Sequence, residues 1–213
     1  MVRVVNSINY FMNPFDNLSN SKKNLRNLIF EEIDNGCLKS ISENYVFPEK
    51  GFIVSSLNKK WKLVLDILDY ELNGKIILDL GCGCNRGNIE SSRYPNEYEP
   101  WFSRFAYGTR DKTGLKIYGV DVGNLSGESF PFLQVNLLKK NCLIDYFSEN
   151  YFDLALAFKL FNSPELEFRV TGNNYLNATR NSAEKLKENI LPQLEQIVKH
   201  NGIFCCIGGD LCF

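Results

Sequence analysis

The chain has 213 residues, of which 44% are hydrophobic and 23% are charged, and its formal net charge is -1. This length and composition are typical of one globular domain whose core needs no disulfide or metal to hold it together. A charge so close to zero creates no global field toward nucleic acid or membrane, and no apolar run approaches a membrane-spanning length. Met1 to Phe15 contain no signal-peptide core, so we expect a cytoplasmic protein without a membrane partner.

Cysteine usage indicates reduced thiols. The chain has seven cysteines, an odd number, and they stand on apolar runs or beside glycines. Such a pattern favours free thiols in a reducing compartment over a disulfide framework. There is no Cys-x-x-Cys pair, and the only histidine, His200, falls at the expected end of a helix. We therefore expect no metal site.

The first 73 residues predict an arm followed by two helices that cover the main domain. Residues 1–19 are interpreted as an irregular arm or a strand packed on that domain, and residues 40–52 as a loop. Apolar residues at helical spacing predict helices at about 21–38 and 55–72. The buried stripe of the second helix consists of Trp61, Val64, Leu65, Leu68 and Leu72, and Gly74 ends it.

An apolar run in residues 75–87 ends in an acid and passes at once into a glycine turn. Ile76 to Leu78 predict a strand buried on both faces, and Gly81 and Gly83 let the backbone turn sharply and a ligand approach closely. Because an α/β sheet binds its ligand beyond the carboxyl ends of its strands, we expect a site at this turn. Asp79 at its mouth would repel phosphate and accept hydrogen bonds from a cationic or hydroxylated ligand.

The next strand, residues 115–121, comes later than the roughly 20-residue spacing of ordinary nucleotide-binding units predicts. The surplus, at about 88–113, mixes aromatic and charged residues, and Pro100 predicts a short helix at about 100–107. We interpret its aromatic side chains as packing, with a lid or acceptor wall as the alternative. Asp121 ends the strand, where a carboxylate can accept bonds from both ribose hydroxyls; the alternative is an exposed acid beginning a turn.

The second half of the chain alternates strands and helices. Further strands are predicted at 132–135, 152–158 and 203–207, and a helix at about 183–200 that Pro192 should kink or split, while Pro164 reads as a loop residue. This alternation predicts an α/β fold with a doubly wound, mostly parallel sheet in the order 3-2-1-4-5. The whole chain is expected to be one domain, with an N-terminal arm and covering helices in residues 1–73 and the core in residues 74–213.

The run Leu78-Asp79-Leu80-Gly81-Cys82-Gly83 resembles the first motif of the class I S-adenosylmethionine-dependent methyltransferases, and later segments within residues 54–208 resemble that family in the same order. The resemblance implies a Rossmann-like transferase with S-adenosylmethionine as its cofactor and a small molecule, protein or RNA as its methyl acceptor. Asn85 stands where the family usually has a third glycine, and asparagine tolerates the left-handed conformation. The antiparallel strand pair that usually ends the family's sheet is expected to be missing.

The resemblance also implies a set of cofactor-binding residues. Asp79 would act on the amino-acid end of the cofactor, and Asp121, which ends a Tyr118–Asp121 motif, would bind the ribose. Asn136 replaces the acid that family members use for the adenine amino group, and its side-chain oxygen can still accept that bond. The complete set is Asp79, Gly81, Cys82, Gly83, Asp121, Val122, Asn136 and Leu137. No catalytic residue is assigned; Lys159 and Glu165 are candidates for a general base.

Two alternatives to a methyltransferase stay open. A nicotinamide-dependent oxidoreductase needs Gly-x-Gly-x-x-Gly, but Arg86 stands at the third glycine and Asp79 would face a pyrophosphate. A methyltransferase-like module that binds a ligand or partner without turnover is favoured by the departures at Asn85 and Asn136. The basic residues Lys59, Lys60, Lys62, Arg104 and Arg110 stand among acids, which predicts solvated faces and does not indicate nucleic-acid binding.

Overall fold

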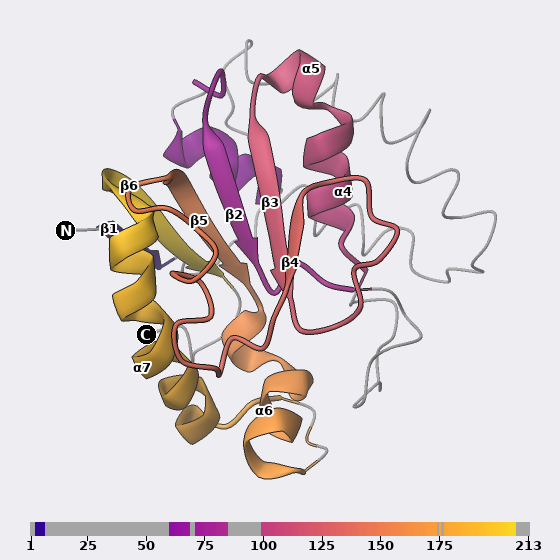
Figure 1. Ribbon diagram of the computed structural model, residues 1–213, viewed down its shortest axis with the longest axis vertical. Helices are drawn as coiled ribbons and strands as arrows, with labels where there is room; N and C mark the ends of the chain where they lie inside the picture. Colours follow the sequence, from indigo (N-terminus) through magenta and orange to yellow (C-terminus); the bar gives the residue numbers. More distant parts are fainter. Residues whose placement is uncertain are drawn as a thin grey trace.

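A parallel sheet forms the centre of the computed structural model, which describes residues 3–6, 60–68, 71–84, 99–173, 175 and 177–207. Its strands are β1 (Arg3–Asn6), β2 (Ile76–Leu80), β3 (Lys116–Asp121), β4 (Phe132–Gln134), β5 (Phe152–Phe158) and β6 (Val198–Ile207). Within the described residues the order is β1-β6-β5-β2-β3-β4, and every pair is parallel (Figure 1). Strands β2 to β6 therefore have the predicted order 3-2-1-4-5, and the expected N-terminal arm adds β1 to the outer edge of β6.

Helices cover both faces of this sheet. Residues 60–67 are helical, and the other helices in the described part of the chain are α4 (Trp101–Gly108), α5 (Arg110–Thr113), the 3-10 turn η3 (Leu160–Asn162), α6 (Pro164–Thr171) and α7 (Arg180–Ile197). The 60–67 helix and α4 pack on one face, whereas α6 and α7 pack on the other. None of the helices in the described residues is long and apolar enough to cross a membrane.

Alternation along β2 divides the core into two layers. Ile77 is fully buried against the 60–67 helix and α4, and Leu78 and Leu80 are fully buried against the α7 side. Successive side chains of a strand point to opposite faces, so an apolar run such as this one fits only a strand covered on both sides. The same alternation directs Asp79 to the face of Ile77, where it lies among apolar groups.

The aromatic side chains of α4 confirm the packing interpretation. Trp101, Phe102 and Phe105 are buried in the core layer formed with the 60–67 helix, and α4 itself lies close to the predicted range 100–107. Trp61 and Phe102 have ring centroids 5.4 Å apart in a tilted arrangement. Aromatic pairs at this distance favour such geometry, so this part of the insert is a core element.

The prediction for Pro164 is wrong, and of the two outcomes predicted for Pro192, a kink or a split, the split is wrong. Pro164 is not in a loop: it is the first residue of α6, whose N-cap Ser163 accepts a bond from the Glu165 N–H, because proline suits a position whose N–H has no helical partner. Pro192 does not split its helix, since α7 runs continuously from Arg180 to Ile197. Buried apolar residues on both sides of Pro192, among them Ile190 and Leu194, hold the helix on the sheet despite the lost hydrogen bond. Because α7 ends at Ile197, His200 lies in β6 and not at a helix end as expected.

The cysteines that the structure describes divide into two groups. Cys82, Cys84, Cys142 and Cys205 are buried free thiols, as expected. Cys206 is disulfide-bonded, so the expectation of reduced thiols is wrong for this residue. Its partner lies outside the described residues, as do the predicted helix at 21–38, the loop at 40–52, Asn85 and the first part of the insert.

Candidate functional site

The glycine turn after β2 is bonded to the neighbouring strand. Gly81 and Gly83 have φ values of 63° and 100°, which side chains other than glycine rarely adopt. The N–H groups of Gly81 and Cys82 both donate to the Val120 carbonyl, at 2.8 and 3.1 Å. These bonds fix the turn at the carboxyl ends of β2 and β3, where a ligand is expected in this type of sheet.

Asp121 at the end of β3 connects this turn to the loop that follows. Its Oδ2 accepts the N–H of Gly83 at 3.0 Å, and its Oδ1 accepts the N–H of Gly123 at 2.9 Å. The Val122 N–H also bonds to this carboxylate, and because a carboxylate offers about four acceptor positions, capacity for one ligand hydroxyl is left. The structure thus brings Gly83 and Asp121, two of the predicted site residues, into direct contact.

Burial and acidic side chains raise the pKa values of the titrating groups at this edge of the sheet. Burial raises the pKa of the Asp121 carboxyl above its ordinary value, against the N–H groups of Gly123, Gly83 and Val122, which lower it. Burial also raises the pKa of the Cys82 thiol well above its ordinary value, and the charges of Asp121 and Asp79 raise it further. Cys82 therefore lies in the field of both acids and stays a neutral thiol.

The Asp79 carboxylate is hydrogen-bonded to other side chains of the protein. It is fully buried, and its Oδ1 accepts a bond from Lys60 Nζ at 2.9 Å while its Oδ2 accepts a bond from Ser103 Oγ at 2.9 Å. Lys60 Nζ also lies 5.0 Å from the ring centroid of Phe102 and 5.1 Å from that of Phe158. Both oxygens of the carboxylate thus have partners from the 60–67 helix and α4, and its charge is balanced by Lys60.

Asn136 and Leu137 follow β4 at the same edge of the sheet. The Asn136 side-chain oxygen, predicted to bind adenine, accepts the N–H of Leu138 at 3.0 Å. Leu137 is buried in the core layer on the α7 side, and its carbonyl accepts a bond from Asn189 Nδ2 at 2.6 Å. The link to the rest of the site is the N–H of Val135, which donates to the Asp121 carbonyl at 2.8 Å.

The side chain of Leu160 lies against the glycine turn, and that of Cys84 lies against the loop after β3. A Cβ added to Gly81 would come 2.8 Å from Leu160 Cδ1, and one added to Gly123 would come 2.1 Å from Cys84 Sγ. Burial raises the pKa of Cys84 to about 12, and the charge of Asp121 adds to this rise, so the thiol is neutral. Leu160 and Cys84 therefore form apolar walls beside the glycine turn and the Asp121 loop.

The two candidates for a general base lie beyond β5. Lys159 has a φ of 58°, a left-handed conformation that is uncommon outside glycine and recurs at functional sites. Glu165 in the first turn of α6 forms an ion pair with Arg169 at 2.7 Å, and its charge raises the pKa of Asp121. Glu165 is thus close enough to Asp121 to act on it electrostatically, and the geometry assigns a catalytic role to neither residue.

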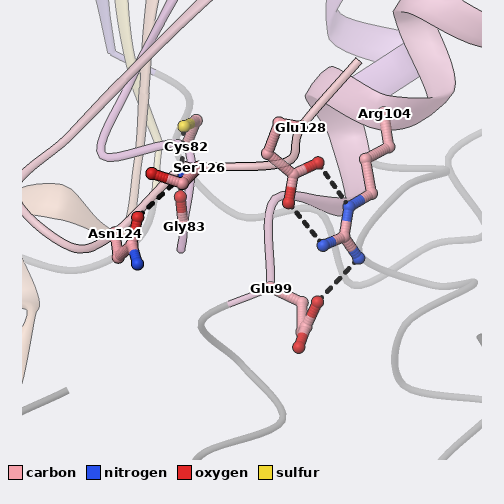
Figure 2. A network of polar contacts seen from close by, with 7 residues as sticks. All are labelled: Cys82, Gly83, Glu99, Arg104, Asn124, Ser126 and Glu128. Atoms are coloured by element: carbon pink, nitrogen blue, oxygen red, sulfur yellow. Dashed lines mark hydrogen bonds and ion pairs between the residues drawn. The ribbon is translucent and has the colours of Figure 1, made fainter. Parts of the chain in front are cut away.

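An arginine clamp holds the loop between β3 and β4 (Figure 2). Arg104 on α4 donates from Nε and Nη2 to the two oxygens of Glu128, at 2.8 and 2.6 Å, and from Nη1 to Glu99 at 2.6 Å. Two parallel bonds to one carboxylate fix orientation as well as distance. Because Gly123 of this loop donates to Asp121, the clamp supports the geometry of the predicted ribose acceptor.

Sequence reasoning missed several of these residues. Lys60 was expected on a solvated face, which is wrong, since it is 7% exposed and paired with Asp79. Its spacing of four residues from Val64 places it on the buried stripe of its helix, a signal that was present in the sequence. Nothing comparable pointed to Ser103, because a pairing across 24 residues depends on the tertiary packing of α4.

No protein-family model matches this chain, and neither a curated protein nor a solved structure matches it. Among the residues that the structure describes, no three histidine, cysteine or acidic side chains are grouped so that they could hold a metal ion. Fold and site therefore define the class of the protein no further than an α/β protein with a doubly wound, Rossmann-like parallel sheet. Its distinguishing feature is a glycine turn bonded to an acid at the end of the adjacent strand.

Proposed function

We propose that the protein binds S-adenosylmethionine and acts as a methyltransferase whose acceptor is a small molecule, a protein or RNA. The observation that carries this proposal is the bond from the Gly83 N–H to Asp121 Oδ2. It joins a turn of two glycines, which have no side chains of their own, to a carboxylate that retains acceptor capacity for a ribose hydroxyl.

The residues present fit the nucleoside part of such a cofactor better than its amino-acid part. Asp121, the turn from Gly81 to Gly83 and the apolar wall of Leu160 suit a ribose and an adjoining thioether or sulfonium. The cofactor itself supplies an electrophilic methyl group, so the protein mainly has to align the acceptor. Lys159 and Glu165, near the mouth of β5, are the residues we propose to probe as bases.

Calorimetric titration with S-adenosylmethionine tests the proposal. The wild-type protein should bind, and Asp121→Ala should bind at least about tenfold more weakly, because hydrogen bonds to a charged acceptor contribute roughly 1.5–3 kcal/mol each. Asp145→Ala, which removes an exposed acid outside the site, is the matched control and should bind as the wild type does. No binding by the wild type, or equal binding by Asp121→Ala, would refute the assignment; binding of a reduced nicotinamide instead would favour an oxidoreductase.

A second candidate is a methyltransferase-like module that binds its ligand without turnover. It is favoured by the engagement of Asp79, whose two oxygens already accept bonds from Lys60 and Ser103. Transfer of a labelled methyl group from S-adenosylmethionine to a panel of small molecules, proteins and RNA separates the two. Binding without any labelled product supports the module, whereas one labelled acceptor supports the enzyme.

A further inference from the structure

The Lys60 ammonium group is held by a carboxylate and two aromatic rings. Its Nζ lies against the Asp79 carboxylate and over the rings of Phe102 and Phe158, at 2.9, 5.0 and 5.1 Å respectively. A carboxylate together with aromatic faces is the combination by which proteins bind ligand ammonium groups. Here the chain's own side chain fills the position, and it is 8% exposed.

This ion pair lies close to the proposed ligand turn. Asp79 is two residues before Gly81, so their backbones are at most about 7 Å apart. Ser103 Oγ donates to the second oxygen of Asp79 at 2.9 Å, so each oxygen of the carboxylate has a partner within the protein. The Cys82 thiol, next to Gly81, has a pKa raised chiefly by burial and further by Asp121 and Asp79, with Lys60 lowering it. The charges of Lys60 and Asp79 thus both act on Cys82, a residue of the turn.

We propose that Lys60 replaces the α-ammonium group of the ligand, so that the site recognises 5′-thioether adenosines through their nucleoside part alone. The inference rests on the proposed nucleoside site and names the ligand class that this site accepts. An unpaired carboxylate would attract a ligand ammonium, whereas Asp79 balanced by Lys60 presents no net charge to it. The amino-acid tail then contributes little to affinity.

The test compares two ligands that share the thioether nucleoside and differ in the tail. S-adenosylhomocysteine carries the amino-acid tail, and 5′-methylthioadenosine has a methyl group in its place. In calorimetric titrations the wild type should bind both with dissociation constants within about threefold of each other. Lys60→Met frees the Asp79 charge and should bind S-adenosylhomocysteine more tightly than 5′-methylthioadenosine by about tenfold or more.

Controls separate charge from general damage. Lys62→Met removes a lysine of the same helix that pairs with Asp66 instead, and it should keep the wild-type ratio of the two dissociation constants. If Lys60→Met does not give a cooperative thermal transition, Lys60→Gln keeps a hydrogen-bond donor for Asp79 without the charge and should shift the ratio in the same direction.

Each outcome decides the matter. A wild type that prefers S-adenosylhomocysteine by tenfold overturns the inference, because the tail is then recognised despite the ion pair. A folded Lys60→Met or Lys60→Gln with an unchanged ratio overturns it as well. If the wild type binds neither thioether nor S-adenosylmethionine, the proposed function itself fails. That result differs from the first one, in which the nucleoside site binds its ligand and also recognises the amino-acid tail.

Discussion

The ammonium group of Lys60 lies 2.9 Å from Oδ1 of Asp79, and the two side chains are 8% and 0% exposed. Removal of one partner leaves the other charge buried, which typically costs about 3–5 kcal/mol, whereas apolar replacement of both is often close to neutral. We expect Lys60→Met and Asp79→Leu each to lower the free energy of unfolding by such an amount, and the double variant to lower it by less than either. Urea denaturation of the four proteins measures the coupling, and strictly additive losses would show that the pair does not act as a unit.

Arg104 and Glu128 provide a second test, because their two parallel bonds hold the loop after β3. Arg104→Lys keeps the positive charge but cannot donate two parallel bonds to one carboxylate, so we expect the free energy of unfolding to fall by about 2 kcal/mol. Amide hydrogens of residues 122–131 should exchange faster in the variant. Arg110→Lys, at an exposed position on the next helix, is the control and should change neither quantity. Equal exchange in both variants would mean that the clamp does not order the loop.

The strands could be predicted because apolar runs mark them locally, and their order followed from the doubly wound topology that alternating strands and helices predict. Residues 76–80 and 152–158 are short, mostly apolar runs that are buried on both faces, and such runs fit the interior of a parallel sheet. The glycine turn at Gly81 and the acid at Asp121 then predicted at which edge of the sheet the candidate site lies. Helix α6 was missed because Pro164 was interpreted alone and not with Ser163, which together are the first residues of a capped helix.

The engagement of Asp79 could not be predicted in the same way. Its partners come from positions 60 and 103, on separate helices, and no periodicity in the sequence specifies which polar groups meet across a core. The identity of Cys206 as a disulfide residue was likewise invisible, because the odd number of cysteines favoured free thiols. Pairing between distant polar or sulfur groups is a tertiary property, and hydrophobic pattern carries no information on it.

Gly119 in β3 should be intolerant of a side chain for steric reasons. A Cβ at this position would come 2.5 Å from Phe130 Cε2 and 2.9 Å from Cys82 Sγ, both buried. Overpacking of this kind costs about 1–3 kcal/mol, so Gly119→Ala should lower the midpoint of urea denaturation. It should also disturb ligand binding, because Cys82 belongs to the turn.

Gly127→Ala is the matched control for this substitution. Gly127 has a φ of 90° and nothing within 4 Å of an added Cβ, so its variant suffers backbone strain without a clash. It should lose stability and keep the wild-type affinity for the proposed ligand, since the change is confined to the exposed tip of the loop. A Gly119→Ala variant that binds as well as Gly127→Ala would contradict a role of the Cys82 position in the site.

The buried thiol of Cys84 should make stability depend on pH in the alkaline range. Burial, with a smaller contribution from Asp121, raises its pKa from 9.0 to about 12 in the folded protein. Above the lower value the unfolded chain loses the thiol proton while the folded chain keeps it, so the unfolded state binds fewer protons and stability falls as pH rises. The contribution is fully present below the unfolded pKa and is lost as pH approaches the folded pKa. Cys84→Ala lacks this loss, so its stability deficit relative to wild type should shrink by about 1.4 kcal/mol between about pH 8 and about pH 10.

Urea denaturation at these two pH values measures the difference. Oxygen-free buffer without reductant keeps the disulfide at Cys206 intact in both proteins. Ser148→Ala, an exposed substitution without a titrating group, should follow the wild-type pH dependence. If Cys84→Ala loses stability with pH as steeply as the wild type, the thiol titrates alike in both states, and Cys84 is then not the buried wall of the Asp121 loop.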